Sequence, residues 1–173
     1  MMQKQQHAIS GFTLTEMLVT LLLLSMTLLC IGGGVVVAKN SYDTISRKSE
    51  AQLLLSTTIL SVTEELRNAT NIQERTVEHN TVISFFQQQR GYQMYFRNTT
   101  SSGKKDNIYI ASVGNSGQLP LINEKVSSDS LYPQIENMTY ENGIFSCTIS
   151  IFYYEEPFLT QVINVRPLNE TNT

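Results

Sequence analysis

The chain has 173 residues, a formal net charge of -3 and two cysteines. This length predicts one folded domain once a leader and an apolar anchor are set aside. The negative net charge excludes a general basic field that would attract nucleic acid. Cys30 and Cys147 cannot form a disulfide framework, so we expect a hydrophobic core to hold the folded domain together.

Residues 12–38 are predicted to form a helix that crosses a membrane. From Met17 to Ala38 there are 22 consecutive residues without a charge. As a helix they span ~33 Å, enough for the hydrocarbon core of a bilayer. Hydroxyl side chains are tolerable there, because they can bond back to carbonyl groups one turn earlier. Glu16 lies just before this run without a basic residue in helical reach, and a lone acid entering a membrane calls for a partner.

The stretch GFTLTEMLVTLLLL, which begins at Gly11, resembles the prepilin signature of type IV pilins and pseudopilins. In that family a short polar leader ends in glycine, phenylalanine follows, and glutamate is the fifth residue of the mature protein. The resemblance covers the first third of the chain. Thr15 departs from the aliphatic residue that usually precedes the glutamate, and we interpret it as a tolerated variant.

The resemblance implies how the chain is processed and assembled. Residues 1–11 would be a leader that a prepilin peptidase removes after Gly11, with N-methylation of the new terminus at Phe12. Glu16 would guide docking of the helix into a growing filament. The implied partners are the peptidase, other pilins or pseudopilins, an inner-membrane assembly platform and the lipid bilayer. The implied location is the cytoplasmic (inner) membrane with the head outside the cytoplasm, and then a cell-surface or periplasmic filament.

Other N-terminal signals fit less well. A secretory signal peptide could be cut after Val36-Val37-Ala38. The apolar core of such a signal is, however, only about half as long as the apolar run of this chain, and it does not begin directly behind an acid. A lipoprotein signal fails because Leu29, not a small residue, precedes Cys30. A plain membrane anchor explains the length of the run but neither the Gly-Phe junction nor Glu16.

Three glycines, Gly32, Gly33 and Gly34, interrupt the apolar run. Each lowers helix propensity by ~1 kcal/mol relative to alanine. They either allow close helix packing in the membrane or form a weak point. Many pilins carry a helix-breaking proline near this position and melt there in the filament, and in the second interpretation the glycines serve the same end. Both interpretations remain open.

Residues 39–72 are predicted to continue the helix with an amphipathic pattern and to end it near Asn68-Ala69-Thr70-Asn71, a cluster of turn and cap formers. The apolar stripe is expected to pack on the protein's own sheet. Its expected members are Gln52, Leu55, Ile59, Val62, Leu66 and Ala69, broadened by Leu53, Leu54 and Leu60. Glu64 and Glu65 are among the charged residues placed off this stripe.

Residues 73–168 are predicted to form a head of strands, and residues 169–173 a polar tail. Strands are expected at Val82–Gln87, Tyr92–Phe96, Asn107–Ala111, Asn137–Tyr140, Ile144–Tyr154 and Phe158–Val165. Asn142-Gly143 is the clearest hairpin signal, and Glu155-Glu156-Pro157 is expected to break the chain before the last strand. A helix followed only by strands predicts an α+β fold, with the long helix packed on a mainly antiparallel sheet.

Catalytic and cofactor signals are absent from the sequence. His79 is predicted to be a surface residue, because no second histidine or cysteine pair completes a metal site. No phosphate loop, dinucleotide fingerprint or Gly-x-Ser-x-Gly motif occurs. We therefore expect neither an enzyme nor a bound cofactor.

The expected function is that of a minor pilin or pseudopilin in a type IV pilus, type II secretion or competence filament. The missing disulfide loop favours a minor over a major subunit. A DNA-uptake pilin is one alternative, but it needs an exposed basic stripe, and nucleic acid is an unexpected partner for this charge. The other alternative is a single-pass membrane protein with a binding head outside any filament.

Overall fold

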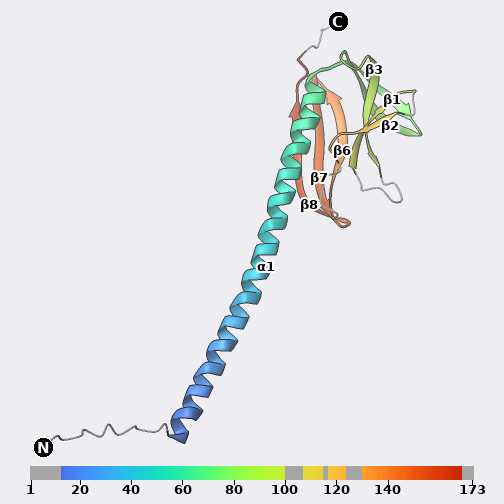
Figure 1. The fold of residues 1–173 in the computed structure, drawn as a ribbon. Coiled ribbons are helices and arrows are strands. Elements are labelled where there is room, and N and C mark those ends of the chain that lie inside the picture. Colours follow the sequence, from blue (N-terminus) through green and yellow to red (C-terminus); the bar gives the residue numbers. More distant parts are fainter. Residues whose placement is uncertain (1–12, 100–106, 115–116, 124–129, 169–173) are drawn as a thin grey trace, which may run out of the picture. The chain divides into compact units, whose positions relative to one another are not determined.

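The computed structural model describes residues 13–99, 107–114, 117–123 and 130–168. The described residues form one helix and eight strands (Figure 1). The chain divides into two compact units, Met1–Ser46 and Arg47–Thr173. The second unit carries all the described strands, and its antiparallel sheets pack on the end of the helix. The predicted α+β fold class is confirmed.

Helix α1 runs from Leu14 to Arg67. In the first unit every residue from Thr13 to Ile45 is exposed. The hydroxyl groups of the apolar run bond back as expected: Thr20 donates to the Met17 carbonyl at 2.9 Å, and Ser25 donates to that of Leu22 at 2.8 Å. These bonds satisfy the hydroxyl groups without a partner outside the helix.

In the second unit, α1 packs on the sheets through a stripe that differs from the predicted one. The buried positions are Ala51, Leu54, Thr58, Val62 and Leu66. Leu55 and Ile59 are half-buried, whereas the predicted members Gln52, Leu53 and Leu60 are exposed. The buried face of the helix is therefore rotated around the helix axis by about one residue position relative to the predicted apolar stripe. Thr58 fits on the buried face because its hydroxyl donates to the Leu54 carbonyl at 2.7 Å.

The helix ends at Arg67, just before the cluster Asn68-Ala69-Thr70-Asn71 near which its end was predicted and short of the predicted segment 39–72. The side chain of Asn68 donates to the Glu64 carbonyl at 3.1 Å, which satisfies one of the last free carbonyl groups. Ala69 begins strand β1 (Ala69–Val77) and is fully buried there. The assignment of Ala69 to the helical stripe was wrong. Residues 69–72 belong to the first strand of the head.

Five strands form the first sheet, in the order β1-β2-β3-β4-β5, with every neighbouring pair antiparallel. The remaining members are β2 (Asn80–Gln87), β3 (Tyr92–Thr99), β4 (Asn107–Ser112) and β5 (Gln118–Pro120). The three strands β2, β3 and β4 were predicted, whereas β1 and β5 were not. Strand β1 is an edge strand with mostly exposed polar residues, so it lacks the apolar alternation that marks a half-buried strand.

Three strands form the second sheet, in the order β6-β7-β8. They are β6 (Leu131–Glu141), β7 (Ile144–Tyr153) and β8 (Glu156–Val165). The predicted turn between β6 and β7 is confirmed, since Asn142 and Gly143 have φ of 52° and 77°. The predicted break before the last strand is confirmed at Glu155, which forms the turn with Tyr154, but it is shorter than expected, because Glu156 and Pro157 already lie in β8. An edge strand tolerates proline, which only loses a donor on its open side.

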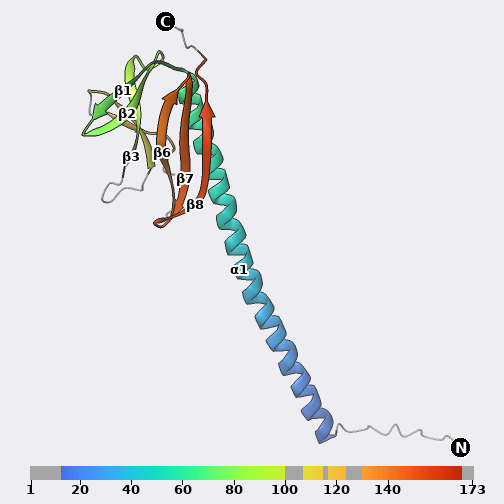
Figure 2. The same cartoon turned by 180° about the vertical axis from the view of Figure 1, so that it is seen from behind.

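One hydrophobic core joins the two sheets and the end of α1. It gathers Val62 and Leu66 from the helix with Phe85 and Phe96 from the first sheet and Phe145 from the second. The rings of Phe85 and Phe96 lie 5.4 Å apart, and those of Phe85 and Phe145 lie 6.4 Å apart. Figure 2, seen from behind, shows β7 and β8 beside this part of α1.

Candidate functional site

The first turn of α1 is closed by a reciprocal pair of hydrogen bonds between Thr13 and Glu16. The Thr13 hydroxyl accepts from the Glu16 amide at 3.3 Å, and the Glu16 carboxylate accepts from the Thr13 amide at 3.1 Å. The Thr13 hydroxyl also donates to the carboxylate at 3.1 Å. This is a capping box, in which two amides that lack helical partners are satisfied.

The capping box gives Glu16 a local partner that the sequence analysis missed. The signal was present as Thr13-Leu14-Thr15-Glu16, a threonine followed three residues later by glutamate before an apolar run. A carboxylate in the first turn also lies favourably in the field of the helix dipole. Glu16 therefore stabilises the start of α1 whether or not it has a second role.

Behind the capping box, α1 is apolar around its whole circumference. Large hydrophobic side chains from Leu14 to Val37 are 57–79% exposed. The described residues contain one helix that is long and apolar enough to cross a membrane, by length and composition. A helix that is hydrophobic all round needs an apolar surrounding, either lipid or other helices.

Gly32, Gly33 and Gly34 lie inside the continuous helix. Apart from adjacent residues and the helix's own backbone, no atom lies within 4 Å of where a Cβ would stand at any of them. A side chain at these positions would thus meet open space within this chain. The three consecutive glycines leave one level of the helix without side chains over about half of its circumference, where another helix could approach closely.

The proposed processing position lies outside the described residues. Gly11 and Phe12 belong to residues 1–12, so the structure does not place them beside Glu16. The structure describes the prepilin-like segment only from Thr13 onward.

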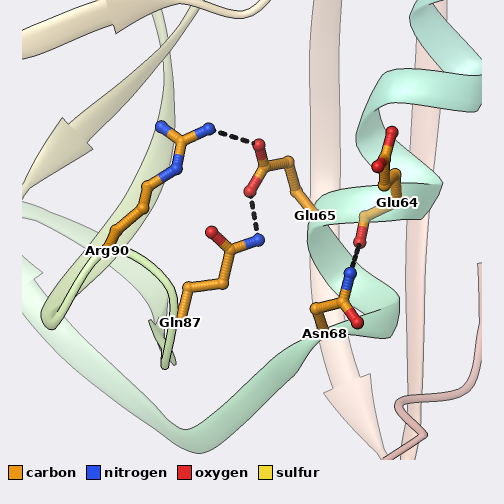
Figure 3. Close-up of polar contacts among 5 residues, drawn as sticks. All are labelled: Glu64, Glu65, Asn68, Gln87 and Arg90. Carbon is orange, nitrogen blue, oxygen red and sulfur yellow. Dashed lines mark hydrogen bonds and ion pairs between the residues drawn. The ribbon is translucent and has the colours of Figure 1, made fainter.

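In the head, an ion pair fastens the β2–β3 turn to the end of α1 (Figure 3). Arg90 donates to one carboxylate oxygen of Glu65 at 2.6 Å, and the side-chain amide of Gln87 donates to the other. The side chains of Glu65 and Arg90 are only 13% and 30% exposed. Sequence analysis placed Glu65 off the apolar stripe and missed this ion pair, because its partners lie more than 20 residues away in the sequence.

Neither Cys147 nor His79 has the surroundings of a catalytic or metal-binding group. Cys147 is buried in the core, and this burial raises the pKa of its thiol to about 11, so it is a poor nucleophile at neutral pH. His79 is exposed, as predicted, at the tip of the β1–β2 hairpin. Among the described residues, no group of three or more His, Cys, Asp or Glu side chains could hold a metal ion.

Comparisons with known proteins gave no family model, no curated protein and no solved structure that matches this chain.

Proposed function

We propose that this chain is a minor pilin or pseudopilin, a structural subunit of a type IV pilus, type II secretion or competence filament. One observation carries the proposal: a glycine–phenylalanine junction stands four residues before an acid at the start of a helix that is apolar all round. The residues are Gly11, Phe12 and Glu16. Neither a plain anchor nor a secretory signal needs this combination.

Removal of the leader after Gly11 would leave Phe12 as a methylated terminus. The apolar surface of α1 would first lie in the inner membrane, anchored as a single pass, and then pack against the helices of other subunits. Both surroundings satisfy a helix that is apolar on every side. The head would remain outside the cytoplasm as the part that differs between subunits. An assembly role requires no catalytic centre and no cofactor.

The test is the mass of the mature protein. The full chain is produced together with a prepilin peptidase, and its N-terminus is read by mass spectrometry. We expect a chain that begins at Phe12 and carries a methyl group. Gly11→Val should keep the leader, because the peptidase must accommodate the residue before the cut. Ser10→Ala is the matched control in the same leader and should be processed normally.

Three results would overturn the proposal. Cleavage after Ala38 would identify a secretory signal. A native chain that keeps its leader in the presence of the peptidase would identify a single-pass protein outside any filament. Normal maturation of Gly11→Val to a chain that starts at Phe12 would equally contradict it.

A further inference from the structure

The turn between β7 and β8 presents a strained and exposed tyrosine. Tyr153 pairs with Glu156, so Tyr154 and Glu155 are the two residues of the turn. Tyr154 has φ of 56°, and glycine, asparagine or aspartate is preferred where the first residue of such a turn has a positive φ. Tyr154 is nevertheless 67% exposed, so its burial in the head does not offset the strain. Strain of this kind is typical of binding surfaces.

Three aromatic side chains gather at this turn, and we call Tyr153, Tyr154 and Phe158 the aromatic tip. The ring centres of Tyr153 and Tyr154 lie 4.7 Å apart, and those of Tyr153 and Phe158 lie 6.2 Å apart. The Arg47 guanidinium of α1 lies 4.8 Å from the centre of the Tyr153 ring. Phe158 is 40% exposed. Tyr153 thus packs on the helix, while Tyr154 and Phe158 are open to the surroundings of the head.

The aromatic tip lies at the end of the head where the helix enters it. Phe145, early in β7, shares its core cluster with Leu66 near the end of α1. Tyr153, the last residue of β7, contacts Arg47, the first residue of the second unit. Strand β7 therefore runs along α1 in the opposite direction. Figure 1 shows the β7–β8 turn at the end of the head opposite the join of α1 and β1.

Eight residues, 39–46, separate the apolar run from Arg47. As a helix, the steps from Ala38 to Arg47 cover ~13 Å. The headgroup layer on one side of a bilayer takes up ~5–8 Å of that distance. A tyrosine side chain covers the remainder on a helix that tilts by ~20°, the average for membrane helices. The linking segment itself exposes Tyr42 and Ile45 at 70% and 68%, so aromatic and apolar surface continues beyond the run.

We propose that the aromatic tip rests on the headgroup region of the bilayer in which α1 is anchored. Tyrosine suits that region, because its ring is apolar and its hydroxyl is polar, and it is enriched there. The charged residues of the turn, Glu155 and Glu156, are exposed and both negative. They oppose anionic lipid, so the surface that fits the tip is zwitterionic lipid. This contact requires the membrane anchor but not assembly into a filament.

Tyr92 provides an internal comparison within the head. It is 39% exposed at the start of β3, just after the turn that Arg90 fastens to Glu65. Glu65 follows Arg47 by 18 residues, ~27 Å along the helix. A head that rests on the membrane through its aromatic tip therefore keeps Tyr92 away from lipid.

The chain contains no tryptophan, so one substitution gives a single fluorescent reporter. Full chains with Tyr154→Trp, Tyr92→Trp or Leu28→Trp are reconstituted in vesicles of zwitterionic lipid, with and without bromine on the acyl carbons nearest the headgroup. Bromine quenches tryptophan only at short range. Leu28→Trp lies in the apolar run, reports the anchor and should be quenched. Tyr154→Trp should lose about half of its emission, and Tyr92→Trp less than about a tenth.

Two further measurements sharpen the test. Phe158→Trp repeats the measurement at the aromatic tip without touching the strained position, and it should also be quenched. Replacing half of the zwitterionic lipid by phosphatidylglycerol should weaken the quenching of Tyr154→Trp, because of the two glutamates.

Several outcomes would overturn the inference. Quenching of Leu28→Trp without quenching at Tyr154→Trp and Phe158→Trp would leave the anchor intact and remove the contact of the head. A blue-shifted but unquenched Tyr154→Trp would mean that protein, not lipid, covers the tip. Equal quenching of Tyr154→Trp and Tyr92→Trp would show a head without a preferred side. Quenching that grows with anionic lipid would replace the aromatic contact by charge attraction. Absence of quenching at Leu28→Trp would remove the anchor and the contact together.

Discussion

Cys147 lies in the core at 1% exposure, and the loss of water around its thiol raises the pKa from 9.0 to about 11. The thiol therefore stays protonated in the folded chain at a pH where the unfolded chain has begun to lose that proton. Its contribution to stability is complete below about pH 9 and is lost as pH rises toward 11.

This pH dependence is a measurable difference between two proteins. Urea unfolding of the native chain and of Cys147→Ala is followed from pH 8 to 11. The gap between their free energies of unfolding should shrink by roughly 2 kcal/mol over that range. Tyrosine ionisation affects both proteins alike and cancels in the difference. A gap that stays constant up to pH 11 would contradict the raised pKa.

Two turns of the head use the same backbone conformation with different residues. Asn142-Gly143 was predicted from sequence because both residues favour a positive φ. Glu78-His79 adopts the same signs of φ and carries no such signal. Local chemistry predicts the first turn. The second is imposed by the strands on either side of it, and single-residue preferences cannot reveal that.

Opposite substitutions at these turns should have opposite effects on stability. Gly143→Val should lower the free energy of unfolding by ~1–3 kcal/mol, because valine is strained at φ 77°. His79→Gly should raise it by up to ~1 kcal/mol, since relief of the strain exceeds the added entropy of the unfolded chain. His79→Ala removes the same side chain without relieving the backbone and serves as control. Urea unfolding measures all three, and a stabilising Gly143→Val would contradict the turn assignment.

At the scale of elements, the end of α1 is joined to the β2–β3 turn by Glu65. Glu65→Ala should destabilise the head by ~1–3 kcal/mol, because it leaves Arg90 and Gln87 without their largely buried acceptor. Glu64→Ala is the matched control, since its side chain is exposed and only its carbonyl is used. It should change stability by no more than ~0.5 kcal/mol. Equal effects of the two variants would show that the ion pair contributes nothing specific.

The elements that sequence predicts well are those with a strong local pattern. The strands that begin at Asn80, Tyr92 and Ile144 alternate or contain runs of apolar residues, and their existence was predicted correctly. Strand β1 was missed because pairing with β2, not burial of its side chains, holds it in the sheet. The buried stripe of the helix was predicted about one position away from where it lies, because Thr58 was not counted as a buried residue. Its hydroxyl is polar but bonds within its own helix, so Thr58 can lie on the buried face.

For the whole molecule, sequence predicted the α+β class but not the division into two sheets. Which strands share a sheet depends on contacts between residues far apart, such as the hydrogen bonds of Asn98 with the backbone of Ile135. The N-terminal signature does not depend on such contacts, because its residues are neighbours in the sequence, and its role stays a prediction.

The last prediction concerns Glu16, for which a cap and a docking role now compete. If the leader is removed, the carboxylate lies four residues from the amine of Phe12, ~6 Å along the helix axis. The capping box brings the carboxylate to 3.1 Å from the Thr13 amide, one residue from that amine, so the amine of its own chain is a competing partner. The amine of a neighbouring subunit, shifted along the axis, can reach it. Pairing at low dielectric would remove the cost of an unpaired acid and fix the register between subunits.

The capping box makes it possible to separate charge from helix capping. Glu16→Val and Glu16→Gln both remove the charge and should lower incorporation into filaments, while insertion and leader cleavage remain normal. Glutamine can still accept the bond from the Thr13 amide, so Glu16→Gln tests the charge alone. Thr13→Ala removes the hydroxyl that caps the Glu16 amide but keeps the carboxylate, and it should be incorporated normally. Cross-linking to other pilins and recovery in sheared filaments measure incorporation. Normal recovery of Glu16→Gln with loss of Thr13→Ala would reduce Glu16 to a helix cap and remove its docking role.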